Sequence, residues 1–345
     1  MTSNDAPSQM AAEVREIPRA VERLLTGGDA AIREAAHAAR ALDPRVIATV
    51  ARGSSDHAAT YLKYAAELTL GLPVASIGPS VASIYGARLK LDRAVCISVS
   101  QSGQSPDIVE MARAAREGGA LTVAVTNNAR SRLAAVSERT IDISAGPELS
   151  VAATKTYVTS VVALLGLVAE WAGDAALVTA IHALPERLDA AARIDWPELR
   201  AALQGSASIF TLGRGPAYAV AGEAALKFKE VSQLHAESYS SAEVLHGPVS
   251  IVGEGFPVLA FAARDAAEEA VTGIADQIAA KGARVFVTSD RAKAANRLPF
   301  VATGHPLTDP LALIVSFYAM VERFARESGI DPDNPRHLRK VTETR

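Results

Sequence analysis

The sequence has no surplus of basic residues and only one cysteine. Its 345 residues include 35 Lys and Arg against 38 Asp and Glu, a formal net charge of −3. Such a chain lacks the basic surface that neutralises a nucleic-acid backbone, so we expect no nucleic-acid partner. A single cysteine excludes an internal disulfide, and the place of Cys96 in the apolar run AVCISV predicts a small buried side chain rather than a nucleophile.

Targeting signals and membrane-length hydrophobic runs are also absent. The N-terminal MTSNDAPSQMAAEVRE lacks the cationic start and apolar core of a secretion signal. No stretch approaches the roughly 20 consecutive apolar residues that cross a bilayer. The most hydrophobic run, residues 157–173, is interrupted by Thr159, Ser160 and Glu170, which favours a buried helix. These absences predict a cytoplasmic protein with no membrane association.

Short β-branched runs alternate with helical patterns along most of the chain. Because 49% of the residues are hydrophobic, the chain can bury more than one core. The β-branched runs are nearly continuous in hydrophobicity, which is typical of parallel strands covered on both faces. The expected strands lie at residues 45–50, 73–77, 94–99, 121–126, 139–144, 208–212, 257–262, 284–289 and 300–303. The pattern predicts an α/β protein with two tandem domains, each a parallel sheet flanked by helices.

The expected domain boundaries divide the chain into four segments. They are an N-terminal helical segment (1–44), a first α/β domain (45–190), a second α/β domain (195–330) and a C-terminal tail (331–345). We expect the first helix to be interrupted near Pro18, since proline removes a helical hydrogen bond. The composition of the tail, DPDNPRHLRKVTETR, is by itself typical of disorder.

Hydroxyl-rich turns follow two of the expected strands in the first half. The strand at 94–99 leads into SQSGQSP (100–106), in which Ser105 can cap a helix. A second turn, ARGSSD (51–56), follows the strand at 45–50. Ligands bind beyond the carboxyl ends of parallel strands, and helix N-termini with hydroxyl groups bind phosphate. Ordinary turn and capping chemistry is the alternative. No nucleotide-type glycine loop occurs, so a small phosphorylated metabolite fits better than a nucleotide.

Charged residues recur on the helix expected over residues 217–235. Glu223 and Lys227 are four residues apart and Lys227 and Glu230 are three apart, so all three can line one side of the helix. A glutamate beside a lysine near a ligand can act as a base whose charge the lysine controls. The alternative is a ladder of ion pairs on the surface. Lys229 falls on another side and is expected to face solvent.

Two histidines follow the same helix. His246 lies in Leu245-His246-Gly247-Pro248, where glycine and proline shape a loop that leaves the imidazole free for proton transfer. We expect His235 to end the helix and to favour its negative terminus. No set of His, Cys, Asp and Glu has convincing metal spacing, so we expect neither a metal nor a cofactor.

Several motifs in the same order resemble the sugar isomerase (SIS) family, most closely the isomerase half of glucosamine-fructose-6-phosphate aminotransferase. The resemblance covers nearly the whole chain. The motifs are MAAEVREIP (10–18), ARGSSD (51–56), SVSQSGQSPD (98–107), ELSVAATKTY (148–157), LGRGPAY (212–218), EAALKFKEVSQLHAESYSSAEVLHGP (223–248) and PRHLRKVTE (335–343). Together they imply two SIS domains.

The resemblance also implies a role for particular residues. Glu230 is expected to move a proton between sugar carbons 1 and 2, with Lys227 assisting it. His246 is expected to open the sugar ring from the neighbouring subunit of a homodimer. Lys340 is expected to close over the substrate, which replaces the disordered interpretation of the tail. The residues implied to bind the substrate phosphate are Ser55, Ser100, Gln101, Ser102 and Ser105.

Two departures from the family pattern matter. Ala153 stands where the pattern more often has serine, which removes one contact near the phosphate. Only nine residues precede MAAEVREIP, so we expect no glutaminase domain and no internal ammonia source. The resemblance then implies deamination of glucosamine 6-phosphate to fructose 6-phosphate and ammonia. Four alternatives stay open: a galactosamine-6-phosphate deaminase/isomerase, a plain ketose/aldose isomerase, a fructosamine-6-phosphate deglycase, and a sugar-phosphate sensor without turnover.

Overall fold

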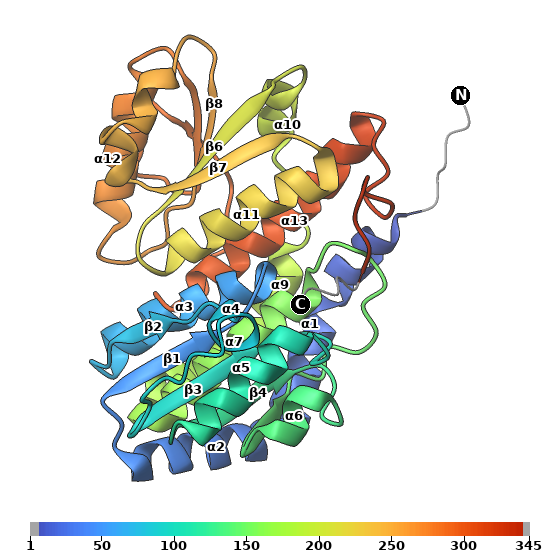
Figure 1. Ribbon diagram of the computed structural model, residues 1–345. Coiled ribbons are helices and arrows are strands. Elements are labelled where there is room, and N and C mark those ends of the chain that lie inside the picture. The colour runs from blue at the N-terminus through green and yellow to red at the C-terminus, as the bar shows by residue number, and fades with distance from the viewer. Residues whose placement is uncertain (1–6, 341–345) are drawn as a thin grey trace. The chain divides into compact units, whose positions relative to one another are not determined.

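The computed structural model describes residues 7–340 and contains two compact units, each built on one parallel β-sheet (Figure 1). The unit called here the sheet A unit consists of Arg19–Pro147 and Lys155–Pro185. The sheet B unit consists of the described residues up to Pro18, together with Glu148–Thr154 and Glu186–Lys340. The expectation of two α/β sheets flanked by helices is confirmed.

Sheet A has five strands in the order β2-β1-β3-β4-β5, and every neighbouring pair is parallel. All five expected strands of this half are present, because β-branched residues favour the extended backbone and both faces of the sheet are covered. The strands are β1 (Val46–Val50), β2 (Val74–Ser76), β3 (Ala94–Val99), β4 (Leu121–Thr126) and β5 (Arg139–Asp142).

Helices cover both faces of sheet A (Figure 1). On one face pack α2 (Asp29–Leu42), α3 (Ser54–Thr69) and α7 (Lys155–Ala172). The other face carries α4 (Ser80–Ser83), α5 (Pro106–Glu117) and α6 (Arg132–Val136). Side chains alternate between the faces. Those that meet α5 and α6 include Ala48, Val50, Ala94, Cys96 and Ala124, which pack on Ile108, Met111 and Leu133.

Sheet B repeats the same arrangement, with strand order β7-β6-β8-β9-β10 and parallel pairing throughout. Its strands are β6 (Ser208–Gly213), β7 (His235–Ser240), β8 (Pro257–Ala260), β9 (Arg284–Val287) and β10 (Asn296–Arg297). The sequence-based strands differ from the structure at three points here. Residues 300–303 form no strand, and neither the edge strand β7, with its polar sequence HAESYS, nor the short strand β10 was expected.

Two long helices, α11 (Pro216–Ser232) and α13 (Asp309–Glu327), pack side by side in the sheet B unit (Figure 1). Contacts of α11 with β6 and β7 place this pair on one face of the sheet. The opposite face packs on α12 (Glu268–Ala279) through an apolar core that includes Phe210, Val258, Val285 and Val271. The remaining elements are α1 (Gln9–Gly27), α8 (Ala175–His182), α9 (Leu184–Ala191), α10 (Pro197–Leu203), η1 (Glu243–Leu245) and η2 (Pro248–Ile251).

The expected end of the charged helix and the expected break at Pro18 are both wrong. Gln233 has a left-handed backbone with φ of 55°, which ends α11 before His235. His235 instead begins β7, and its Nδ1 lies 3.0 Å from the hydroxyl of Ser208. Pro18 lies inside the continuous helix α1. Burial of Ile17 and Val21 beside it offsets the hydrogen bond that proline removes.

The hydrophobic run at 157–173 lies in α7, whose side chains are buried against α2 and α3 as expected. Among the described residues, no helix combines the length and the apolar character that a membrane span requires.

Candidate active site

Three charged side chains of α11 form a cluster in the sheet B unit. The Nζ of Lys227 lies 3.6 Å from Oε1 of Glu223 and donates a hydrogen bond to Oε2 of Glu230. Tyr318 of α13 also donates to Oε1 of Glu223, at 2.9 Å. The expectation that the three residues share one side of the helix is confirmed. The side chains of Lys227 and Glu223 are 1% and 0% exposed, so the cluster is not a ladder on the surface. Lys229 is exposed, as expected.

The environment of Lys227 keeps its amine charged. Burial alone would lower the pKa of Lys227, but the carboxylates of Glu223, Glu230 and Glu148 outweigh burial and raise it above the usual value. Glu230 is 23% exposed and therefore reaches the edge of the cluster. A fixed cation beside a partly exposed carboxylate can hold that carboxylate in place and stabilise negative charge next to it.

Glu148 is a member of this cluster that sequence reasoning missed. Its side chain is 0% exposed, and its Oε2 accepts a hydrogen bond from Nζ of Lys340 at 2.8 Å. Its Oε1 accepts one from the backbone N–H of Thr154 at 3.0 Å. One signal was available, because Glu148 is the only acidic residue of the ELSVAATKTY motif.

The C-terminal segment is tied into the same unit. Asp333 accepts hydrogen bonds from the backbone N–H groups of Gln9 and Met10, at 2.6 and 2.9 Å, at the start of α1. Glu13 of that helix accepts from the N–H groups of Leu149 and Ser150. For residues 331–340 the disorder that composition suggested is therefore wrong, while residues 341–345 lie outside the described part.

His246 lies apart from these contacts. Its side chain is exposed and follows η1, with Gly247 at φ of 138°. Within residues 7–340, no side chain forms a hydrogen bond or an ion pair with its imidazole. The structure thus brings Glu230, Lys227, Glu148 and Lys340 into one unit but shows no contact between His246 and that cluster.

The two hydroxyl-rich turns lie beside each other in the sheet A unit, because β1 and β3 are neighbouring strands. Ser55 lies in the first turn of α3, and Ser105 is the N-cap residue of α5, as expected. The side chain of Ser105 forms no capping hydrogen bond. Two helix N-termini therefore begin at the same edge of the sheet, each next to hydroxyl groups.

An ion pair joins the two turns. Arg52 of the first turn bonds to Asp107 in the first turn of α5, and the Asp107 side chain is fully buried. The second turn also depends on Gly103, which has φ of 62°. A Cβ at this position would collide with the side chains of Ser131 and Thr126. The shape of the turn thus requires glycine.

The hydroxyls of the second turn keep their hydrogens available. Oγ of Ser100 accepts from the N–H of Gly103 at 3.2 Å, and Oγ of Ser102 accepts from the N–H of Gln104 at 3.3 Å. Neither hydroxyl donates to another group in the described part of the chain. Hydroxyl donors and helix N-termini at one edge are suited to an anion such as phosphate.

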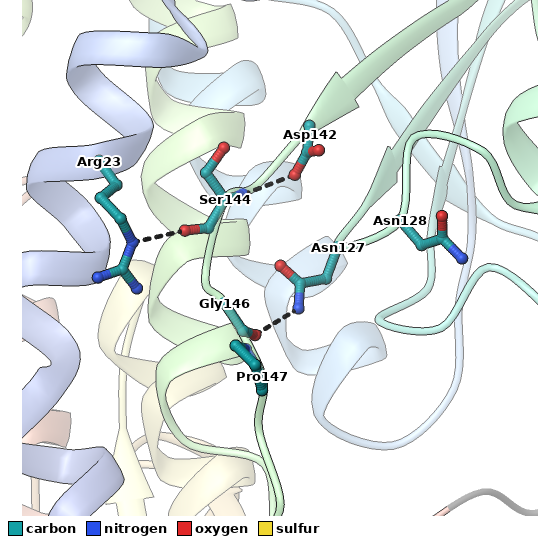
Figure 2. A pocket seen from close by; sticks show the side chains of 7 residues that line it. All are labelled: Arg23, Asn127, Asn128, Asp142, Ser144, Gly146 and Pro147. Atoms are coloured by element: carbon teal, nitrogen blue, oxygen red, sulfur yellow. Dashed lines mark hydrogen bonds between the residues drawn. The ribbon is translucent and has the colours of Figure 1, made fainter.

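A separate polar hollow of about 600 Å³ lies at the ends of β4 and β5 in the sheet A unit (Figure 2). Its polar groups are bonded to one another. Arg23 donates to the backbone oxygens of Ser144 and Ala145. The side-chain amide of Asn127 donates to the backbone oxygen of Gly146 at 2.8 Å. None of the residues implied for substrate binding lines this hollow.

The single cysteine lies in the interior of the sheet A unit. Cys96 is fully buried, as expected, and burial raises the pKa of its thiol to about 12, although a hydrogen bond with Ser98 lowers it slightly. Over residues 7–340, no group of three or more His, Cys, Asp or Glu side chains is arranged to hold a metal ion.

Solved structures with the same fold include phosphosugar enzymes. A protein of Silicibacter pomeroyi DSS-3, described as a candidate phosphosugar isomerase, is 66% identical, with a TM-score of 0.93 over 95% of this chain and 100% of that one. The C-terminal domain of glucosamine-fructose-6-phosphate aminotransferase from Francisella tularensis has 23% identity and a TM-score of 0.83, over 97% and 100% of the two chains. Glucosamine-6-phosphate deaminase from Thermotoga maritima has 19% identity and a TM-score of 0.79, over 98% and 100%. At the two lower identities, the likeness concerns the fold.

The curated relatives are longer proteins. Glutamine–fructose-6-phosphate aminotransferase (isomerizing) of Symbiobacterium thermophilum is 35% identical over 364 residues, which cover 96% of this chain and 58% of that protein. This chain thus spans little more than half the length of that relative. The family model for the SIS domain matches residues 42–169 and 202–295. The chain therefore belongs to the SIS domain family.

Proposed function

We propose that this protein is a sugar-phosphate isomerase that converts glucosamine 6-phosphate and water to fructose 6-phosphate and ammonia. The observation that carries the proposal is the hydrogen bond from the buried, charged Lys227 to the partly exposed Glu230. A carboxylate held in this way is suited to remove a proton from a carbon next to a carbonyl or imine group. The names of several relatives, which handle amino-sugar or sugar phosphates, agree with this chemistry.

The proposed reaction begins with ring opening, in which His246 passes a proton to the ring oxygen, the bond from that oxygen to carbon 1 breaks, and the hydroxyl group on carbon 1 loses its proton to become the aldehyde. Glu230 then removes the proton from carbon 2 of the open-chain amino sugar and returns it to carbon 1. Together with the passage of one proton from the 2-amino nitrogen to the oxygen of carbon 1, this transfer converts the aldehyde with its 2-amino group into a 2-imine that carries a hydroxyl group on carbon 1. Addition of water to the imine gives a carbinolamine, which releases ammonia and leaves fructose 6-phosphate. Lys227 and Lys340 stabilise the enediol-like negative charge that develops during the transfer.

The substrate phosphate is proposed to bind the two turns at the edge of sheet A. The support is local to that unit, where the N-termini of α3 and α5 and the available hydroxyls of Ser100 and Ser102 lie at one edge. The full proposed set is Ser55, Ser100, Gln101, Ser102 and Ser105. At position 153, the methyl group of alanine supplies no hydroxyl contact.

The chain is further proposed to act as a homodimer in which His246 serves the partner subunit. Two observations support this arrangement. His246 is exposed, and among the described residues its imidazole has no polar contact with the cluster around Lys227.

A substrate panel tests the proposed reaction directly. The purified chain is incubated with glucosamine 6-phosphate, galactosamine 6-phosphate, fructosamine 6-phosphate and tagatose 6-phosphate, and ammonia and ketose are measured by separate coupled assays. We expect equal amounts of ammonia and fructose 6-phosphate from glucosamine 6-phosphate. Turnover of only the galacto epimer would contradict the substrate assignment. Tight binding of fructose 6-phosphate without any turnover would instead show a sensor.

The matched control is a pair of glutamate-to-glutamine variants in the sheet B unit. Glu230→Gln is expected to reduce ammonia release by roughly 10²–10⁴-fold. Glu237→Gln, in the edge strand β7, removes a carboxylate that bonds to Tyr239 at 2.7 Å and is expected to keep near-wild-type activity.

A further inference from the structure

Glu148 uses both of its carboxylate oxygens inside the sheet B unit. One oxygen accepts from the backbone N–H of Thr154, which closes the loop of residues 148–154, and the other accepts from Lys340. The side chain is fully buried. A buried carboxylate is costly unless it is paired with a cation and hydrogen-bonded, so this position strongly favours a nearby ammonium group.

The segment that carries Lys340 is anchored at two points. Asp333 fixes it to the first backbone N–H groups of α1, at Gln9 and Met10. Residues 336–339 between the anchors are exposed, and the backbone of His337 is left-handed, with φ of 63°. Lys340 then turns inward, and its side chain is only 25% exposed. Glu148 therefore holds the inward end of the exposed stretch 336–339.

The carboxylate of Glu148 also acts on the cluster of α11. Its negative charge is one of three that raise the pKa of Lys227. Glu148 therefore interacts electrostatically with two amines that are 113 residues apart in the sequence.

From this geometry we infer that Glu148 is a positioning residue, which sets the place of the Lys340 amine for the proton transfer at Glu230. The inference rests on the proposed function, in which Lys340 stabilises the charge of the transferring group. Without the ion pair, the ammonium group of Lys340 moves away from Glu148 together with the exposed segment. A displacement of about 1 Å in a stabilising group can reduce turnover by about 10²-fold.

The two oxygens of Glu148 allow its contact with Thr154 to be separated from its contact with Lys340. Glu148→Gln keeps a side-chain oxygen that can accept from the Thr154 N–H, so the loop retains its hydrogen bond. It removes the negative charge that holds Lys340. The matched control is Glu13→Gln, because Glu13 is equally buried and bonds to the same loop, at Leu149 and Ser150, without contacting Lys340.

A double-mutant cycle of kcat and KM tests whether Glu148 acts through Lys340. We expect Glu148→Gln to reduce kcat by about 10²-fold with little change in KM. In a Lys340→Met background, the same substitution is expected to have almost no further effect. Glu13→Gln is expected to reduce kcat little, and by the same factor in both backgrounds. An equal loss from Glu148→Gln in both backgrounds would refute the inference.

A readout that needs no substrate separates this inference from the proposed function. The rate of acetylation of the Lys340 amine is measured by peptide mass spectrometry on the native protein. We expect an increase of about tenfold in Glu148→Gln, since the amine loses a charged hydrogen-bond partner, and no change in Glu13→Gln. Unchanged labelling in Glu148→Gln would overturn the inference even if the enzyme is active. Increased labelling in a protein without turnover would support the ion-pair role and refute only the proposed function.

A second variant guards against loss of folding. Glu148→Asp keeps the charge but withdraws the carboxylate by one methylene group. Its labelling rate is expected to lie between those of wild type and Glu148→Gln. If Glu148→Gln fails to fold, labelling in Glu148→Asp that equals the wild-type rate would count against the inference.

Discussion

Three carboxylates surround one buried amine in the sheet B unit. Glu223 and Glu230 lie on the same helix as Lys227, while Glu148 comes from a distant loop. The amine compensates carboxylates that could not remain charged alone in a buried site. The same contacts that stabilise the fold thus prepare a charged lysine beside the proposed base.

Replacement of this lysine is predicted to destabilise the protein. Lys227→Met leaves the buried carboxylate of Glu223 without its cation, which costs about 3–5 kcal/mol of unfolding free energy. The exposed Lys229 offers a matched control, since Lys229→Met is expected to change stability by no more than about 0.5 kcal/mol. Urea denaturation at neutral pH measures both values. Equal stability of the two variants would contradict a buried ion-pair role for Lys227.

The contribution of Lys227 is predicted to disappear at alkaline pH. Its pKa is raised in the folded protein, so folding favours the protonated amine. The stabilisation is complete below the unfolded-state pKa of about 10.4 and decreases as pH rises through the higher folded-state pKa. The difference in unfolding free energy between wild type and Lys227→Met should therefore be constant from pH 7 to about 10 and should shrink above that range. A difference that grows with pH would contradict this assignment.

Sequence reasoning could place Glu223, Lys227 and Glu230 together because the helical repeat brings residues three and four apart onto one side. The helical repeat could not find Glu148, since no local period relates a loop residue to a helix 79 residues away, and only its place in the ELSVAATKTY motif marked it. It also could not show that the helical cluster is buried, because burial depends on the packing of α13 against α11.

At the scale of elements, the turn between β3 and α5 combines two requirements. It must present hydroxyls at the sheet edge, and it must pass close to Ser131 and Thr126. Only glycine at position 103 meets the second requirement, because its backbone is left-handed and a side chain has no room.

Gly103→Ala is therefore predicted to reduce the free energy of unfolding more than Gly205→Ala does. Left-handed backbone strain costs about 1–2 kcal/mol for alanine, and overpacking against the two side chains adds about 1–3 kcal/mol. Gly205→Ala is the control, since Gly205 is also left-handed, with φ of 76°, but a methyl group there would meet no neighbouring atom within 4 Å. Urea denaturation should show a larger loss for Gly103→Ala. Equal losses would show that the turn has room for a side chain.

Strands were predicted well where they are apolar and poorly where they are not. The strands β1, β3 and β4 of sheet A are mostly apolar and largely buried, whereas β7 has the polar sequence HAESYS and lies at the edge of sheet B. An edge strand needs only one neighbour and less burial, so its composition carries a weak signal. The helix before it ends through the left-handed Gln233, a conformation that the sequence does not announce.

Over the whole molecule, the two sheets have the same strand order but different chemistry at corresponding turns. The turn after β3 reads Ser100-Gln101-Ser102-Gly103, while the corresponding turn after β8 reads Phe261-Ala262-Ala263-Arg264. The turn after β8 thus lacks the hydroxyl groups of its counterpart. The second half carries instead the cluster around Lys227. This difference agrees with the proposal that one half binds phosphate and the other transfers protons.

Subunit complementation tests the proposed role of His246 across a dimer. Glu230→Gln and His246→Asn are each expected to be nearly inactive. If the histidine serves the partner's site, mixed dimers contain one intact site, and random mixing should restore about a quarter of wild-type turnover. Turnover is measured after the two variants are unfolded and refolded together. The absence of recovery, with dimers present by light scattering, would place both residues in the same subunit's site.

The central claim is that Glu230 transfers a proton between sugar carbons 1 and 2. The most direct measurement is proton NMR of glucosamine 6-phosphate incubated with the protein in deuterium oxide, which follows loss of the carbon 2 proton and its arrival at carbon 1 of the product, or its replacement there by deuterium where Glu230 exchanges with solvent first. The wild type and Glu237→Gln are predicted to show both changes, and Glu230→Gln is predicted to show them roughly 10²–10⁴-fold more slowly. Exchange at the wild-type rate in Glu230→Gln would contradict the account.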